Sequence, residues 1–335
     1  MEYRHLGRSG LKVSPLCLGA MMFGGPTGEA DSRAIIARAR EQGVNFIDTA
    51  DAYNAGASEE VVGRAIAADR GWWVVATKLA NPTDAAAGPN GAGLSRRHAI
   101  RAAEASLRRL AIDTIDILYW HKEDHATPLA ESVHAMADLV RAGKIRHFGV
   151  SNHRAWRIAE ICRLCDEAGI DRPVVSQPLY NAMNRMVEVE HLPACGAYGL
   201  GVFAYSPLAR GVLTGKYQPN VAPAEGTRAA RRDKRMMETE WRPESLAIAA
   251  EFAARARALG VTPGQWAVAW VLRNRLVTGV IAGPRTMQQW EDYVPALGLR
   301  LDAEDEALVD RLVAPGHPST PGYNDPAYPL EGRSV

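Results

Sequence analysis

The chain has 335 residues, of which 47% are apolar and 23% are charged, and its formal net charge at pH 7 is +1. This length and composition predict a globular protein with a large core, and the near-zero charge disfavours a dedicated nucleic-acid binder. No apolar run approaches the roughly 20 residues that cross a membrane, and the polar start does not resemble a signal peptide. We therefore expect a cytoplasmic protein that engages neither nucleic acid nor a membrane.

Short apolar runs alternate with helical patterns along the chain. Residues 3–13 predict a β-hairpin that turns at 7–10. Eight β-prone runs then predict strands at 16–18, 44–47, 73–77, 115–120, 145–150, 174–177, 201–205 and 277–281. Helices are predicted to begin after the N-cap candidates Asp31, Ser58 and Ser95, and to span about 129–140, 153–168, 187–197, 244–273 and 286–296.

Eight strand and helix units in succession predict a (β/α)8 TIM barrel, because parallel strands need helical crossovers. A doubly wound sheet is the alternative, but the glycines after the first strand lack the G-x-G-x-x-G spacing of its dinucleotide-binding turn. We expect a single domain over residues 1–335. Two regions depart from the alternation: a long loop after the seventh strand, 209–243, with a basic cluster at 228–235, and an irregular proline-containing tail at about 315–335.

Titratable side chains stand at the ends of successive predicted strands. Asp48 follows the second strand, Lys78 the third and His121 the fourth, and Tyr53 lies five residues beyond Asp48. Any one of them alone is more often a capping, packing or surface residue. Neighbouring parallel strands end at the same mouth of a barrel, where barrel enzymes hold their active sites. The recurrence therefore predicts a functional site at that mouth.

Metal chemistry is a second interpretation of the same strand ends. A metal-dependent hydrolase would draw its ligands from His121, His125, Asp48 and Asp51. The chain lacks an H-x-H pair or a comparable ligand cluster at successive strand ends, which disfavours this interpretation. Cys162 and Cys165 form a C-x-x-C within a predicted helix, where two buried thiols are expected rather than a metal or redox site. No metal is predicted.

Ordered motifs over nearly the whole chain resemble those of the aldo-keto reductases. They are NFIDTADAY at 45–53, Lys78, His121, GVSN at 149–152, Gln177 with Tyr180 and Asn181, and AYSPLARGVLTGKY at 204–217. The resemblance implies NADPH-dependent reduction of an aldehyde or ketone, with a small-molecule carbonyl compound as the partner. The catalytic residues that it implies are Asp48, Tyr53, Lys78 and His121.

The implied chemistry needs a hydride on the carbonyl carbon and a proton on its oxygen. Tyrosine, with an ordinary pKa near 10, is too weak an acid without help. Lys78 is expected to stabilise the tyrosinate of Tyr53, and Asp48 to hold that lysine charged. His121 is expected to hydrogen-bond the substrate oxygen.

The resemblance also assigns residues to NADPH or NADP+. Ser151, Asn152 and Gln177 are expected to hold the nicotinamide carboxamide, and Tyr205 to stack on its ring. Arg285 is expected to pair with the 2′-phosphate and so to favour NADPH over NADH. The full set of expected cofactor residues is Gly19, Ala20, Met21, Asp48, Ser151, Asn152, Gln177, Tyr205, Ser206, Pro207, Leu208, Ala209, Gly211, Lys216, Arg228, Gly283, Arg285, Gln289 and Asp292. The expected substrate pocket consists of Phe23, Tyr53, Leu79 and His121.

A non-catalytic subunit is the alternative function. The fold family includes channel-associated β subunits that retain the nucleotide, so the same residues fit a nucleotide-binding regulatory subunit. The intact set of four strand-end residues favours the enzyme. The sequence assigns neither a particular substrate nor an oligomeric state.

Overall fold

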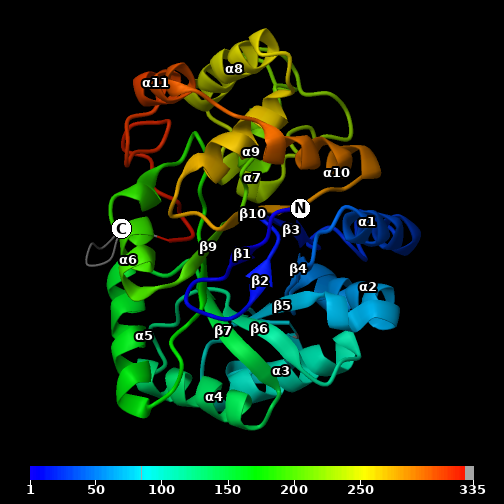
Figure 1. Ribbon diagram of the computed structural model, residues 1–335, viewed down its shortest axis with the longest axis vertical. Helices are drawn as coiled ribbons and strands as arrows, with labels where there is room; N and C mark the ends of the chain where they lie inside the picture. The colour runs from blue at the N-terminus through cyan, green and yellow to red at the C-terminus, as the bar shows by residue number, and fades with distance from the viewer. Residues whose placement is uncertain (84, 329–335) are drawn as a thin grey trace. The chain divides into compact units, whose positions relative to one another are not determined.

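Eight parallel strands form a closed barrel in the computed structural model, which describes residues 1–83 and 85–328. The strands are β3 (Leu16–Gly19), β4 (Phe46–Asp48), β5 (Val74–Leu79), β6 (Ile115–Trp120), β7 (Ile145–Ser151), β8 (Val175–Gln177), β9 (Gly201–Ala204) and β10 (Gly279–Ala282). They follow one another around the barrel in chain order, and β10 closes it against β3 (Figure 1). The predicted (β/α)8 barrel is confirmed, and the doubly wound sheet is excluded.

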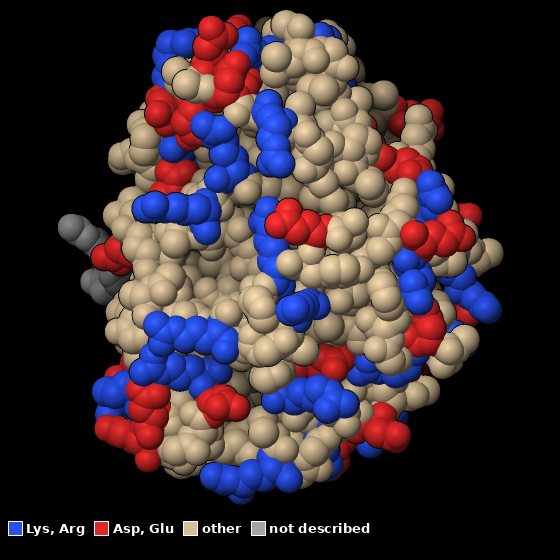
Figure 2. Space-filling model, in the orientation of Figure 1, with Lys and Arg blue, Asp and Glu red and all other residues tan. Residues whose placement is uncertain are grey.

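Helices lie on the outside of the barrel, each of them following a strand (Figure 1). They are α1 (Glu29–Glu41), α2 (Ala57–Ile66), α3 (Arg96–Leu110), α4 (Leu129–Arg141), α5 (Ala155–Ala168), α6 (His191–Tyr198) and α10 (Met287–Tyr293). None of the helices in the described ranges is long and apolar enough to span a membrane. Figure 2 shows basic side chains beside acidic ones on the face that it draws. One such pair is Arg172 and Asp166, at 2.6 Å. Exposed pairs of this kind contribute little to stability.

One of the three predicted N-caps is confirmed. The side chain of Ser95 accepts a hydrogen bond from the His98 backbone N–H at the start of α3. The other two are wrong, because α1 begins at Glu29 after Gly28 and α2 begins at Ala57 after Gly56. Ser58 lies inside α2, where its buried hydroxyl lies 2.7 Å from Thr49 Oγ1 and donates to the Ala20 carbonyl over 2.7 Å. A tertiary partner therefore replaced the local capping bond.

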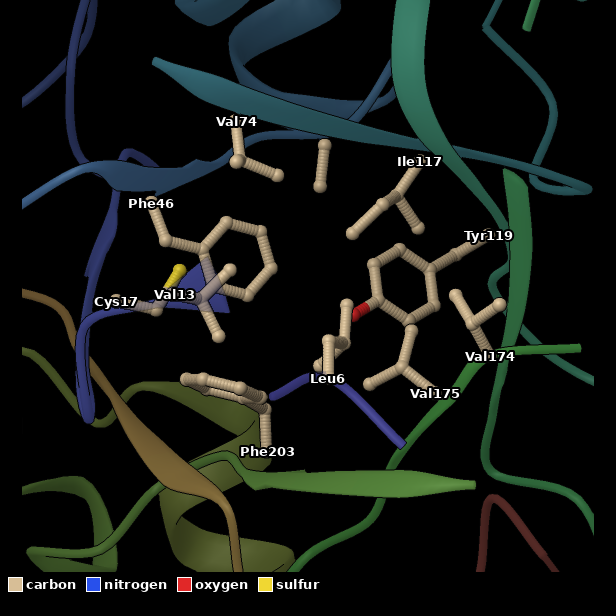
Figure 3. Packing of buried hydrophobic residues seen from close by; sticks show 11 residues of the cluster. Leu6, Val13, Cys17, Phe46, Val74, Ile117, Tyr119, Val174, Val175 and Phe203 are labelled. Carbon is tan, nitrogen blue, oxygen red and sulfur yellow. The ribbon is translucent and has the colours of Figure 1, made fainter. Parts of the chain in front are cut away.

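The predicted hairpin, β1 (Arg4–His5) and β2 (Lys12–Val13), is confirmed and adds apolar side chains to the core. Leu6 and Val13 are fully buried beside Phe46 and Phe203, whose rings meet edge to face at 4.8 Å (Figure 3). The hairpin turn contacts the chain backbone closely: Gly7 has a φ of +56°, and a Cβ there would lie 2.5 Å from the Gly199 carbonyl oxygen. Only glycine fits this position.

The described chain divides into two compact units. The first, residues 1–178, 190–205 and 275–291, contains the whole barrel, whereas the second contains 179–189, 206–274 and the segment from 292 onward. Elements of the second unit are η5 (Ala209–Thr214), α7 (Lys234–Thr239), α8 (Pro243–Ala258), α9 (Pro263–Arg273), η6 (Val294–Gly298) and α11 (Ala303–Leu312). The expectation of a single domain over 1–335 stays a prediction.

The second unit holds the long loop and the tail. The predicted helical stretch at 244–273 is two helices, α8 and α9, and short α7 lies within the loop that was expected at 209–243. After α11 the described tail is irregular, as predicted, and is tied to its own unit by Ser319 Oγ, which lies 2.9 Å from Ser245 Oγ. The part of the predicted tail at 329–335 lies outside the described residues.

Candidate active site

The barrel register places the four predicted catalytic residues at one mouth. Asp48 ends β4, Lys78 is the penultimate residue of β5, and His121 directly follows β6. Tyr53 begins η1 (Tyr53–Gly56), a turn in which Asn54 and Ala55 have φ values of 49° and 54°. Such left-handed backbone costs free energy for residues with a side chain and is concentrated at functional sites.

Lys78 is the centre of the site. Its Nζ lies 2.5 Å from Asp48 Oδ2, 2.7 Å from the Thr49 carbonyl oxygen and 3.2 Å from the Tyr53 hydroxyl oxygen. Lys78 is fully buried, and Asp48 is 2% exposed. An ammonium has three N–H donors, so each of them has an acceptor here, and one of them points at Tyr53.

The charge on this lysine follows from its neighbours. Burial alone would lower the pKa of Lys78, but the Asp48 carboxylate and Tyr53 outweigh it and raise the pKa above its ordinary value. The ammonium is therefore charged at neutral pH. A fixed cation beside a phenol stabilises the phenolate, which is the form left after the phenol gives up its proton.

His121 stands beside Tyr53, with the two ring centroids 5.8 Å apart in an edge-to-face arrangement. Burial of the ring, together with the nearby cations Lys78 and Lys122, lowers the pKa of His121 to about 3. The imidazole is therefore neutral at physiological pH. Its Nδ1 lies 3.0 Å from Nδ2 of Asn81, a residue that the sequence analysis did not single out.

Four residues predicted to hold the nicotinamide form one hydrogen-bond network beside the predicted catalytic residues. Asn152 donates from Nδ2 to the His121 carbonyl over 2.8 Å, and it accepts a 2.8 Å bond from the Tyr205 hydroxyl. Ser151 donates to the Gln177 carbonyl over 2.8 Å, and Gln177 Nε2 donates to Asp48 Oδ1 over 3.0 Å. The structure thus brings the predicted carboxamide residues into contact with Asp48 and His121, and these polar side chains fit an amide ligand.

Other predicted cofactor residues lie at neighbouring strand ends of the barrel unit. Gly19 ends β3, and the next residue, Ala20, donates from its N–H to the Asp48 carbonyl over 2.8 Å. Met21 follows and is 38% exposed. Beyond β10, the backbone of Arg285 is held on both sides: its carbonyl accepts from Thr27 Oγ1 at 3.0 Å, and its N–H donates to Gln289 Oε1 at 2.8 Å. Gly283 lies between β10 and this residue.

The remaining predicted cofactor residues belong to the second unit. They are Ser206, Pro207, Leu208, Ala209, Gly211, Lys216, Arg228 and Asp292. Ser206 and Ala209 have φ values of 53° and 46°, so the turn around η5 is strained, and a Cβ on Gly211 would lie 3.1 Å from Lys216 Nζ. Asp292 accepts hydrogen bonds from Thr262 and Gln265 at the start of α9. Cofactor roles for these eight residues, and for the predicted cofactor residues of the barrel unit, stay predictions.

The predicted substrate pocket has two kinds of members. Tyr53 and His121 are half-buried, whereas Phe23 and Leu79 are fully buried. The pocket assignment stays a prediction for all four.

Metal binding finds no support in the geometry. Across 1–83 and 85–328, no group of three or more His, Cys, Asp and Glu residues is arranged to hold a metal ion. His125 pairs with Glu123 at 3.2 Å. Cys162 and Cys165 are free and buried, as expected.

Comparison with known proteins assigns the family. The sequence model of the Aldo/keto reductase family matches residues 15–314. The chain belongs to this family. The resemblance seen in the sequence motifs is therefore confirmed.

Relatives in the aldo/keto reductase family carry two kinds of names. A probable voltage-gated potassium channel subunit beta of Arabidopsis thaliana is 37% identical over 305 residues, covering 89% of this chain and 91% of that protein. The uncharacterized oxidoreductase YrpG of Bacillus subtilis (strain 168) is 37% identical and covers 96% of this chain and 99% of its own. The L-glyceraldehyde 3-phosphate reductase of Escherichia coli O157:H7 is 33% identical, covering 94% and 93%.

Proposed function

We propose that this protein is an NADPH-dependent reductase of aldehyde or ketone carbonyls, with Tyr53 as the general acid. The observation that carries the proposal is the charged, fully buried Lys78, whose Nζ lies 3.2 Å from the Tyr53 hydroxyl oxygen. A tyrosine in that position releases a proton more readily than one in water, because the ammonium stabilises the phenolate. Asp48 keeps the lysine charged, and Gln177 keeps Asp48 oriented.

The proposed division of labour at the barrel mouth follows from these contacts. NADPH, when bound, would supply the hydride for the carbonyl carbon. Tyr53 gives its proton to the carbonyl oxygen, and the neutral His121 beside it donates a hydrogen bond to the same oxygen. Ser151, Asn152 and Gln177 offer amide and hydroxyl groups that suit the nicotinamide carboxamide.

A regulatory, nucleotide-binding subunit is the second candidate function. It is favoured by the potassium channel subunit beta relatives, at 37% and 38% identity. The complete set of Asp48, Tyr53, Lys78 and His121 favours a reductase, because a subunit that only binds nucleotide has no need of a proton donor.

Turnover of NADPH separates the two candidates. We expect the purified protein to oxidise NADPH in the presence of a panel of short-chain, aromatic and phosphorylated aldehydes that includes glyceraldehyde 3-phosphate. Tyr53→Phe should lower kcat/KM by at least about 10²-fold, the usual contribution of a general acid, with nucleotide affinity unchanged. Tyr3→Phe, at an exposed tyrosine, is the matched control. Nucleotide binding without aldehyde-dependent turnover would favour the regulatory subunit.

A further inference from the structure

We propose that Asn81 is a positioning residue that holds the His121 imidazole in the tautomer with its proton on Nε2. The inference deepens the proposed reductase function, because it says how His121 comes to be a hydrogen-bond donor to the substrate oxygen. It rests on the 3.0 Å contact between Asn81 Nδ2 and His121 Nδ1.

The backbone of His121 is held by hydrogen bonds to both its N–H and its carbonyl. The His121 N–H donates to the Leu79 carbonyl over 2.9 Å, and the His121 carbonyl accepts from Asn152 Nδ2 over 2.8 Å. The ring therefore has a defined position at the end of β6, and Asn81 contacts one of its two nitrogens.

A neutral imidazole has one nitrogen that donates and one that accepts. Burial lowers the pKa of His121 to about 3, so the neutral form is the relevant one. The side-chain nitrogen of Asn81 is only a donor, so Nδ1 must be the acceptor and Nε2 must carry the proton. The opposite tautomer would present a lone pair from Nε2, which repels a carbonyl oxygen.

The backbone before and after Asn81 is constrained in a way that serves this contact. Ala80 has a φ of +119°, a conformation that is costly for any residue with a Cβ. The Ala80 carbonyl accepts from the Gly93 N–H over 2.9 Å, and Pro82 restricts Asn81 to extended backbone. The turn after β5 thus holds the Asn81 amide against the neighbouring ring.

Ring-nitrogen NMR of His121 tests the tautomer directly, and it requires no turnover. In the unmutated protein labelled with ¹⁵N-histidine, we expect Nε2 to be protonated and Nδ1 unprotonated between pH 6 and pH 9. Asn81→Asp replaces a donor by an acceptor of the same shape, so Nδ1 should become protonated and the His121 pKa should rise. Asn90→Asp, at an exposed position, makes the same charge change and should leave both signals unchanged.

Kinetics test the consequence. In Asn81→Asp the imidazolium still carries a proton on Nε2, but the neutral ring carries its proton on Nδ1. We therefore expect kcat of this variant to decrease as the pH rises and the imidazolium loses its proton, a decrease that the unmutated protein does not show. On the alkaline side we expect a loss of about 10²-fold, the usual effect of removing one donor to a developing oxyanion, with KM changed little. Asn81→Leu should lose activity at every pH without that new dependence.

Two outcomes would overturn the inference: a protonated Nδ1 in the unmutated protein, and ring signals that Asn81→Asp leaves unchanged. A reversed tautomer in Asn81→Asp with unchanged kcat would overturn the donor role of His121 toward the substrate but not the tautomer. An unmutated protein with the expected ring signals and no carbonyl reduction would overturn the proposed function but not the tautomer. The two failures are therefore distinguishable.

Discussion

Gln177 Nε2 donates a hydrogen bond to Asp48 Oδ1 across 3.0 Å, although 129 residues separate the two in the chain. Asp48 ends β4 and Gln177 ends β8, which lie four strands apart in either direction around the barrel. Since Lys78 occupies Oδ2, both oxygens of the carboxylate are engaged and its plane is fixed. A strand from the far side of the barrel therefore helps to orient the acid that holds the lysine.

Removing the lysine should leave that carboxylate buried without a counter-ion. We expect Lys78→Met to lower the free energy of unfolding by about 3–5 kcal/mol, the usual cost of breaking a buried ion pair. The double variant Asp48→Asn with Lys78→Met should recover most of this loss, because no uncompensated charge remains. Urea denaturation of both proteins gives the comparison. A double variant as unstable as Lys78→Met would contradict the explanation, and neither variant should reduce aldehydes.

Asp51 should make stability depend on pH. It is 1% exposed, and burial, with a further contribution from the Glu59 carboxylate, raises its pKa to about 7. Because the folded pKa lies above the unfolded value near 3.9, ionised Asp51 destabilises the fold. The penalty is absent below about pH 4, grows between pH 4 and 7, and reaches about 4 kcal/mol above pH 7.

Asp51→Asn should remove this penalty. Relative to the unmutated protein, we expect a gain that approaches about 4 kcal/mol at pH 8 and vanishes at pH 4, measured by urea unfolding at several pH values. Asp31→Asn, at an exposed position, should show no such dependence. An equal gain at pH 4 and pH 8 would mean that charge is not the cause.

Arg285 should set the choice of cofactor. Thr27 and Gln289 fix its backbone at the start of α10, so its guanidinium extends from a rigid base. Charge-assisted hydrogen bonds contribute on the order of 1.5–3 kcal/mol each, so NADPH should bind at least about tenfold more tightly than NADH. Arg285→Ala should lower that affinity ratio by weakening the binding of NADPH. Arg285→Lys should give an intermediate ratio, because a lysine keeps the positive charge but not the paired N–H donors of the guanidinium.

Fluorescence titration with both nucleotides, at low and at moderate salt, measures this ratio. Arg33→Ala, at an exposed arginine of α1, controls for a general loss of positive charge. Equal affinities of the unmutated protein for NADPH and NADH would contradict the assignment.

The basic cluster at 228–235 should respond to nucleotide. Within its own unit, Arg228 lies 3.7 Å from Asp233, and Arg235 lies 2.6 Å from Asp325. Arg231 and Arg232 are exposed, so trypsin should cleave there. We expect saturating NADPH to slow this cleavage several-fold by ordering the segment, and Arg228→Ala to reduce the protection. Identical digestion with and without nucleotide would contradict the expectation that nucleotide orders this segment.

The sequence predicted Asp48, Lys78 and His121 as one site because the alternation of strands and helices predicts a barrel, and each of these residues stands at or near the end of a strand. Neighbouring parallel strands of a barrel end at the same mouth, so this prediction does not depend on the conformation of the loops. The partner of His121 was not predictable in this way. Asn81 reaches the ring through a positive φ at Ala80, and no pattern of apolar residues encodes that angle.

Helix boundaries show the same limit. Ser95 was predicted correctly as an N-cap because its hydroxyl bonds the local backbone, whereas the Ser58 hydroxyl bonds Thr49 and Ala20 from inside α2. Local rules fail where a distant partner competes for the same group. Helix α11 was missed although Asp302 and Asp305 form a capping box at its start, a signal that the sequence does contain.

The barrel closes between β10 and β3, with Val280 paired to Leu16 and Ile281 to Cys17. The barrel therefore cannot close during biosynthesis until β10 has been translated. The first barrel strand, β3, leaves the ribosome long before its neighbour β10 has been translated. At the usual 5–20 residues per second, the delay is on the order of ten seconds to a minute. Throughout that interval β3 carries an unpaired edge, so the nascent chain is a natural client for chaperones that shield exposed strands.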